Sequence, residues 1–319
     1  MSGPLLVEVT RGGRAESLHE VDVVLVDTSG RIVEAWGDAT RPVMPRSAIK
    51  PIQALPLVST GAADAFGLTD VELALACASH GGEPRHVDAV AGWLARLGVD
   101  SSALACGAQV PSSAPAAAVM AAAGGEATAV HNNCSGKHTG FLTVLCHLGL
   151  PLDGYLDPGH RLQADHVTPW IERTCGVDLA AARPGVDGCG IPVWSMPLDR
   201  LASGWATIGA EPAGSSAHRL LSAMRSEPFL VAGSARACTR LIGAATGATV
   251  VKAGAEGVFC AVVPADGIGL ALKVRDGAAR AAEVAVEWIL ARCGRLPDPV
   301  LSRLVNHSGV HVGEVRVAG

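Results

Sequence analysis

Segments that alternate apolar and polar residues occur at both ends of this chain, and the long stretch between them has helical periodicity instead. Alternation with a period of two is typical of half-buried strands, and turn residues at Asp27–Gly30 separate two of the early segments as in a hairpin. We therefore predict an α+β fold, with an antiparallel sheet built from about residues 1–45 and 245–319 and a helical lobe inserted at about 46–244. We take these as two lobes of one domain. The expected strands are 6–10, 21–26, 32–36, 249–252, 258–263, 268–274 and 310–317.

Capping patterns mark two helices of the inserted lobe most clearly. Thr69 and Glu72 have the spacing of a capping box, and the stretch 84–97 begins with Pro84 and ends at Gly98, a favourable residue just past a helix. The segment 111–125 is rich in Ala and Pro, which fits either a helix or a mobile loop. Further helices are expected at about 137–147, 159–174, 217–224, 235–245 and 278–293.

Composition excludes several classes of protein. The formal net charge is -5 and only 3% of residues are aromatic, so the chain lacks the basic surplus and stacking groups that nucleic-acid binding needs. Charge, Pro or Gly interrupts every apolar run before it reaches the roughly 18 residues of a membrane span. The first residues lack the apolar core of a secretory signal, and nine cysteines cannot all be paired within the chain. We expect a cytoplasmic protein with reduced thiols and no nucleic-acid or membrane partner.

A serine and a lysine three residues apart, Ser47 and Lys50, form the first candidate site. Because Pro51 must lie in the first turn of a helix, we expect a helix that begins close to Ser47 and places Lys50 on the same face. The S-x-x-K pattern carries the acylated serine of penicillin-binding proteins and serine β-lactamases. An ordinary helix cap followed by a solvated lysine is the alternative. Ser79 and a late Lys252-Ala253-Gly254 favour the nucleophile interpretation, because such sites often have a second serine and a lysine on a late strand.

Two loops contain the cysteines that are candidates for chemistry. Cys134 lies in a stretch of His, Asn, Lys and Ser side chains just before an expected helix, and glycines flank Cys189. Two thiolates suit zinc, but paired C-x-x-C or H-x-x-x-H ligands are absent, so spacing alone leaves the third ligand open among His131, Lys137 and His138. Cys106 stays unassigned. The other six cysteines are expected to be packing residues: Cys77, Cys146, Cys175, Cys238, Cys260 and Cys293.

With these residues together, the chain resembles the asparaginase II family of the Rhizobium etli type, nearly end to end. Five blocks carry the resemblance, in the family's order: PRSAIKPIQ, CASHGGEPRH, HNNCSGKHTG, VDGCGIPVWSMP and VVKAGAEGVF. It implies a β-lactamase- and glutaminase-like fold, a homodimer, and hydrolysis of L-asparagine to L-aspartate and ammonia. It also implies two serine-lysine pairs, Ser47 with Lys50 and Ser79 with Lys252, and a zinc ion on Cys134, Lys137 and Cys189.

The substrate's own charges suggest further binding residues. Asp187 is a natural partner for the α-amino group, and Arg46 or a helix N-terminus for the α-carboxylate. We count His138 with them as substrate-binding. Three rival hypotheses stay open: a β-lactamase or penicillin-binding type of serine hydrolase, a metallohydrolase that uses zinc-bound hydroxide, and a non-catalytic binding protein on the same fold.

Overall fold

The computed structural model of the protein describes residues 2–297 and 302–318. Backbone contacts divide the chain into two compact units. The sheet unit comprises Met1–Ala48, Ser195–Ala210 and Ala244–Gly319, and the helical unit comprises Ile49–Trp194 and Glu211–Gly243. The predicted α+β class is confirmed, as is a sheet drawn from both ends of the chain.

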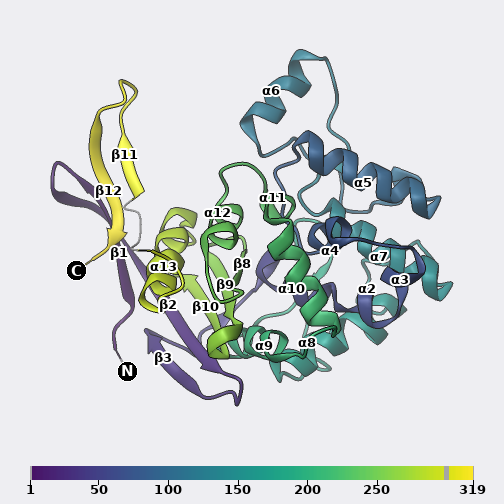
Figure 1. Cartoon of the computed structure of the whole chain (residues 1–319), viewed down its shortest axis with the longest axis horizontal. Helices are drawn as coiled ribbons and strands as arrows, with labels where there is room; N and C mark the ends of the chain where they lie inside the picture. The colour runs from purple at the N-terminus through teal and green to yellow at the C-terminus, as the bar shows by residue number, and fades with distance from the viewer. Residues whose placement is uncertain (1, 298–301, 319) are drawn as a thin grey trace. The chain divides into compact units, whose positions relative to one another are not determined.

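One antiparallel sheet forms the centre of the sheet unit. Its strand order is β11-β12-β1-β2-β10-β9-β8, and β3 also pairs with β2. Early and late strands therefore lie side by side, as the purple and yellow-green arrows in Figure 1 show. The strands are β1 Leu5–Arg11, β2 Arg14–Asp27, β3 Ile32–Trp36, β8 Val250–Ala253, β9 Val258–Val263, β10 Ile268–Val274, β11 Ser302–Val305 and β12 His311–Val317.

Two helices pack on this sheet, α9 (Leu198–Ala210) and α13 (Ala279–Arg292). Helix α9 touches β2, β9 and β10, and a Cβ at Gly269 of β10 would collide with the backbone of Ala202. The segment 195–210 therefore belongs to the sheet unit, whereas our sequence boundaries placed it in the helical lobe. A short pairing of β4 (Pro42–Val43) with β7 (Met196–Pro197) leads the chain into α9.

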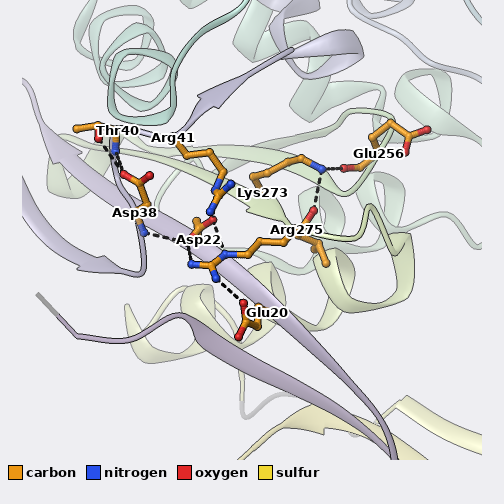
Figure 2. A network of polar contacts seen from close by, with 9 residues as sticks. Glu20, Asp22, Asp38, Thr40, Arg41, Glu256, Lys273 and Arg275 are labelled. Atoms are coloured by element: carbon orange, nitrogen blue, oxygen red, sulfur yellow. Dashed lines mark hydrogen bonds and ion pairs between the residues drawn. The ribbon is translucent and has the colours of Figure 1, made fainter.

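A buried carboxylate is the polar centre of the sheet unit. Asp22 of β2 is fully buried and accepts hydrogen bonds from Arg275 at 2.8 and 3.0 Å, from Arg41, and from the backbone amide of Asp38 at 2.9 Å. Figure 2 shows these groups converging on Asp22, with Lys273 nearby donating to the Glu256 carbonyl. Burial alone would raise the pKa of Asp22, but the hydrogen bonds outweigh burial and lower it.

The helical unit contains the other α-helices and the β5–β6 hairpin. Both predicted capping patterns are confirmed: Thr69 and Glu72 form a capping box before α4, and Gly98 ends α5 in a left-handed conformation. The helices are α1 Lys50–Gln53, α2 Leu55–Ser59, α3 Ala62–Ala65, α4 Asp70–Ala76, α5 Pro84–Leu97, α6 Ala114–Ala122, α7 Ser135–Leu148, α8 Thr168–Cys175, α10 Ser216–Ser226, α11 Pro228–Ala232 and α12 Ala237–Ala244; the hairpin strands are β5 Gly185–Val186 and β6 Pro192–Val193.

Some elements differ from their predicted form. The segment 111–125 contains the helix α6, and the predicted helix 159–174 is a π-helical turn at Leu162–Val167 followed by α8. The α-helix expected to begin close to Ser47 begins three residues later, at Lys50, with Pro51 in its first turn as required. Arg46 has a φ of 50°, outside the helical range, and a 3₁₀ turn over Arg46–Ile49 comes first. Across the described residues, no helix has the length and apolarity to span a membrane.

Candidate active site

A buried lysine and a serine form the first half of the candidate site. Lys50, the first residue of α1, is fully buried, and its Nζ donates to the Oγ of Ser79 at 2.9 Å and to the carbonyl oxygen of Ala78. Ser79 follows the end of α4 and is 8% exposed. Because a buried amine without hydrogen-bond partners is costly, these acceptors are what makes the position of Lys50 tolerable.

Two cysteines and a second lysine form the other half. The Lys50 Nζ also lies 3.1 Å from the Cys134 Sγ, and the Nζ of Lys137 donates to the Cys189 Sγ at 3.0 Å. Cys134 is the residue just before α7 and Lys137 lies in the first turn of that helix, while Cys189 comes from the β5–β6 hairpin. Both lysines and both cysteines are buried. We call Cys134, Lys137 and Cys189 the thiol cluster.

Two sequence details explain how α7 brings its first turn to this place. The side-chain oxygen of Asn132 accepts from the Cys134 amide at 2.8 Å, which holds the turn before the helix. A Cβ at Gly136 would collide with the backbone of Leu75, so only glycine allows α7 to start this close to α4. The block HNNCSGKHTG therefore contains both the reactive groups and the residues that place them.

The three residues of the thiol cluster have shifted pKa values. The pKa of Cys134 lies well below its usual value, foremost because the Cys189 thiol hydrogen-bonds to it and then because Lys50 and Lys137 are close. The pKa of Cys189 is raised by sharing that hydrogen bond and by burial. Burial would lower the pKa of Lys137, but the two sulfurs and Asp187 outweigh it and raise the pKa. Cys134 is thus the cysteine of the cluster whose thiolate form is favoured.

The donor set fits a metal that accepts sulfur and nitrogen ligands. Among the described residues, no group of three His, Cys, Asp or Glu side chains is arranged to hold a metal. Zinc would therefore depend on Cys134 and Cys189 with a neutral Lys137, the set that the family resemblance implies, and two adjacent soft sulfurs are the ligands that zinc prefers.

The two histidines considered as third ligands have other partners. The Nδ1 of His138 is 2.6 Å from the Tyr155 hydroxyl, and His138 is fully buried. Its Nε2 has no hydrogen-bond partner within the described part of the chain. The Nδ1 of His131 accepts from the Thr128 amide at 3.2 Å. The structure thus places His138 against Tyr155, and its role in substrate binding stays a prediction.

Asp187 lies in the β5–β6 hairpin, two residues before Cys189. Its amide donates to the Ile191 carbonyl at 2.9 Å and its carboxylate accepts from the Gly188 amide at 2.8 Å. The carboxylate is half-buried, and its charge contributes to the raised pKa of Lys137. The hairpin therefore sets an acidic group close to the thiol cluster.

The remaining predicted residues, Arg46, Ser47 and Lys252, belong to the sheet unit. Lys252 on β8 is buried, and its Nζ donates to the Ala253 carbonyl at 2.8 Å. A Cβ at Gly254 would lie 2.8 Å from the Pro45 carbonyl and 3.2 Å from the Ala48 amide. The end of β8 is therefore packed against the turn that carries Ser47, and only a residue without a side chain fits between them.

Lys50 makes a hydrogen bond that the sequence did not predict, while the two predicted serine-lysine pairs stay predictions. The sequence paired Ser47 with Lys50 and Ser79 with Lys252. The structure hydrogen-bonds Lys50 to Ser79, one member of each predicted pair, and packs the end of the Lys252 strand against the Ser47 turn. Sequence reasoning also missed the contact of Lys50 with Cys134.

A separate hollow of about 410 Å³ opens in the helical unit, between α5 and α6. Its lining is largely apolar and, apart from His131, includes none of the residues named from the sequence as candidates for the site. The residues that line it are Gly82, Glu83, Pro84, Val87, Asp88, Pro111, Ser113, Pro115, Ala116, Val119, Met120 and His131.

Comparison with known proteins identifies the family. Residues 7–317 match the model of the L-asparaginase II family, and the chain belongs to that family. Among curated protein sequences, no significant match to this chain is found.

Two solved structures are similar at a low level. One is a β-lactamase from Mycobacterium bovis, 13% identical, with a TM-score of 0.40 over 80% of this chain and 86% of that one. The other is a mutant simvastatin synthase from Aspergillus terreus, 10% identical, with a TM-score of 0.34 over 80% of this chain and 86% of that one.

Proposed function

We propose that this protein is an L-asparaginase, which hydrolyses the side-chain amide of L-asparagine through a serine activated by Lys50. Membership of the L-asparaginase II family supports the reaction. The observation that carries the mechanism is the 2.9 Å hydrogen bond between Lys50 Nζ and Ser79 Oγ, buried away from solvent. A lysine at hydrogen-bond distance from a hydroxyl is the arrangement that activates a serine when the amine is neutral.

The reaction would proceed through an acyl-enzyme. The serine hydroxyl gives its proton to the neutral amine of Lys50 while its oxygen attacks the amide carbon of the substrate. The C–N bond then breaks, the departing nitrogen takes up a proton and leaves as ammonia, and water hydrolyses the ester to release aspartate. We assign the second serine, together with Lys252, to proton transfer to the leaving group.

Ser47 and Ser79 are the two candidate nucleophiles. Ser47 is the serine that the S-x-x-K pattern names, three residues before Lys50, and Ser79 is the serine that hydrogen-bonds Lys50. Replacing the nucleophile with Ala removes the acyl-enzyme itself, whereas replacing the relay serine slows its formation. Mass spectrometry of protein quenched during turnover locates the acyl group on one serine or the other.

Substrate binding would use the charged residues named from the sequence. We propose Asp187 for the α-ammonium group of asparagine and Arg46 for the α-carboxylate. Asp187 already lies close enough to Lys137 for its charge to contribute to the raised pKa of that lysine. Exchange of Asp187 for Asn is expected to raise KM more than it lowers kcat.

We further propose that zinc binds Cys134, Cys189 and Lys137. When bound, zinc would supply Lewis acidity and fix the α7 turn to the β5–β6 hairpin. Elemental analysis tests this: Cys134→Ala is expected to lose zinc, and Cys146→Ala, in α7 but outside the cluster, is expected to keep it. Stoichiometric zinc in Cys134→Ala would refute the site.

One assay separates the rival functions. Ammonia release is measured from asparagine, glutamine and simple β-lactams, with and without chelator, for wild type, Ser47→Ala, Ser79→Ala and a control variant. The control is Ser203→Ala, whose hydroxyl donates to the Asp199 carbonyl within α9 at 2.9 Å. The proposal expects asparagine to be the best substrate and both site variants to lose turnover. A zinc-hydroxide enzyme would instead survive the serine changes and stop with chelator. A pure binding protein would release no ammonia.

The family resemblance also leads us to propose a homodimer that works in the cytoplasm. Analytical ultracentrifugation tests the oligomeric state, and cell fractionation tests the location.

A further inference from the structure

The loop that carries Ser79 is held by backbone bonds on two sides. The Ser79 and Gly81 amides donate to the carbonyls of Val231 and Ala232, at 3.0 and 2.8 Å. Between them, the His80 amide points the other way and donates to the Asn133 carbonyl at 3.1 Å. The loop therefore runs like a short strand between the end of α11 and the turn before α7.

The side chain of His80 strengthens the second of these connections. Its Nδ1 accepts from the Gly82 amide at 3.2 Å and its Nε2 is 2.9 Å from the Ser135 Oγ. Burial, together with nearby positive charge, holds the pKa of His80 well below its usual value, so the ring is neutral and carries one proton. Since Nδ1 is an acceptor, that proton is on Nε2 and His80 donates to Ser135.

Stacking fixes the plane of this ring. The His80 ring lies 4.7 Å from that of His86 at an angle of 9°, and the His86 ring lies 4.8 Å from that of Phe229 at 8°. His80 has no exposed surface. The ring therefore cannot turn without displacing two aromatic neighbours.

His80 and Ser135 are the direct chain neighbours of two site residues. Ser79 precedes His80, and Cys134 precedes Ser135. The same two segments are joined a second time by Lys50, whose Nζ contacts both the Ser79 Oγ and the Cys134 Sγ. The two segments are therefore connected twice. Lys50 connects Ser79 to Cys134, and the side chain of His80 contacts that of Ser135.

We propose that His80 is a positioning residue that fixes Ser79 and Cys134 at one spacing, so that Lys50 reaches both. The inference rests on the proposed function, because its purpose is to hold the serine at the base. Without the His80–Ser135 bond, the two segments are joined at this point by the Asn133 carbonyl and by Lys50 itself. Ser79 would then drift from Lys50 by the fraction of an ångström that acid-base catalysis cannot tolerate.

Four single variants and one double variant test this. His80→Phe keeps a flat ring for the stack and loses both side-chain bonds, and Ser135→Ala removes the acceptor. His80→Gln keeps an N–H donor of similar reach. His86→Phe is the matched control, since it keeps the stack and has no bond to Ser135. Circular dichroism and thermal melting confirm that each variant is folded.

The expected losses are in kcat. His80→Phe and Ser135→Ala are expected to lower kcat for asparagine by about 10- to 100-fold with KM changed less than about threefold, as for other residues that orient a catalytic group. His80→Gln recovers most of the activity, and His86→Phe stays within about twofold of wild type. Because the two residues act through one bond, the double variant His80→Phe/Ser135→Ala is expected to lose no more than the worse single variant. Two outcomes would overturn the proposal. In one, the fold-loss in kcat of the double variant equals the product of the two single losses; in the other, His86→Phe is as impaired as His80→Phe.

A second readout does not depend on turnover. This readout is the rate at which a thiol reagent labels Cys134 in metal-free protein, measured on the Cys134 peptide by mass spectrometry. The rate is expected to rise about tenfold in His80→Phe and Ser135→Ala and to stay unchanged in His86→Phe. If wild type releases no ammonia, the proposed function fails while this measurement still tests the positioning role. Equal labelling rates in all variants would overturn the positioning role itself.

Discussion

The two units of this protein each bury charge, and they surround it differently. In the sheet unit, the buried carboxylate of Asp22 meets the guanidinium groups of Arg41 and Arg275, which stay charged at any ordinary pH. In the helical unit, the buried amines of Lys50 and Lys137 meet a hydroxyl and two thiols, which can themselves give up a proton.

The difference separates a structural charge from a chemical one. A carboxylate between two arginines has one stable protonation state, so its contribution is to stability and conformation. An amine beside hydroxyl and thiol groups can exchange protons with them, which is what acid-base and nucleophilic chemistry require. Each prediction below tests whether the two units really differ in this way.

The largest expected effect is on activity, from removing the amine of Lys50. Lys50→Met is expected to lower ammonia release by about 10²- to 10⁴-fold, because the serine loses its base. The control is Lys273→Met in the sheet unit, whose amine donates to the Glu256 and Val274 carbonyls at 2.6 and 2.7 Å. Its activity is expected to remain within about twofold of wild type. Equal losses of activity in Lys50→Met and Lys273→Met would contradict the proposed difference between the two units.

The next effect is on stability, from removing the carboxylate of Asp22. Asp22→Ala is expected to lower the free energy of unfolding by about 3 kcal/mol, since two arginines lose the group they surround. Chemical denaturation at pH 7 measures this. The matched control is Asp64→Asn, which breaks an exposed pair with Arg219 and is expected to change nothing measurable. A stable Asp22→Ala protein would show that the network is dispensable.

Acid should weaken the same network in a predictable direction. The pKa of Asp22 is lowered in the folded state, so its contribution to stability is full above the unfolded pKa of about 3.9 and is lost as pH falls through the lower folded value. Below about pH 4, the unfolding free energy of wild type is expected to decrease with falling pH more steeply than that of Asp22→Asn. The difference in slope is up to ~1.4 kcal/mol per pH unit. Parallel curves for the two proteins would contradict this origin of the acid sensitivity.

The smallest effect concerns the one place where the sheet unit carries predicted catalytic residues. Gly254→Ala would push a methyl group against the Pro45 carbonyl and the Ala48 amide, which displaces the Ser47 turn. Ammonia release is expected to fall about tenfold, the change of about 1.4 kcal/mol that a small displacement of a catalytic group produces. Gly243→Ala in α12, with open space around it, is expected to leave activity unchanged and to raise stability by up to about 1 kcal/mol. Unchanged activity in Gly254→Ala would remove the Ser47 turn from the site.

Local patterns in the sequence were enough for much of the fold. The strands β3, β9 and β10 have the predicted bounds, because alternation and short turns leave little choice of ends. Thr69 and Gly98 cap their helices as expected, since capping depends on neighbours in the chain. The assignment of α9 to the sheet unit was missed, because it depends on where the face of that helix packs.

The site residues were named from motifs, but their contacts depend on tertiary structure. The hydrogen bond between Lys50 and Ser79 spans 29 residues, and that between Lys50 and Cys134 spans 84. The close approach of α4 and α7 at Gly136 is likewise recorded by no local pattern. Arg46 has a left-handed conformation, and a 3₁₀ turn stands where the helix was expected to begin. The sequence does not predict this conformation, because Arg46 is not a glycine.

The pairing of β2 with β10 has a consequence for synthesis. Leu25 of β2 lies opposite Leu270 of β10, so the partner of an early strand is made almost 250 residues later. At roughly 5–20 residues per second, the ribosome needs about 12 to 50 seconds to deliver it. During that time the apolar β2 has one free edge on the nascent chain, while the residues of the helical unit are being added. The hydrophobic edge of β2 is therefore where a chaperone is expected to bind this protein before the last third is complete.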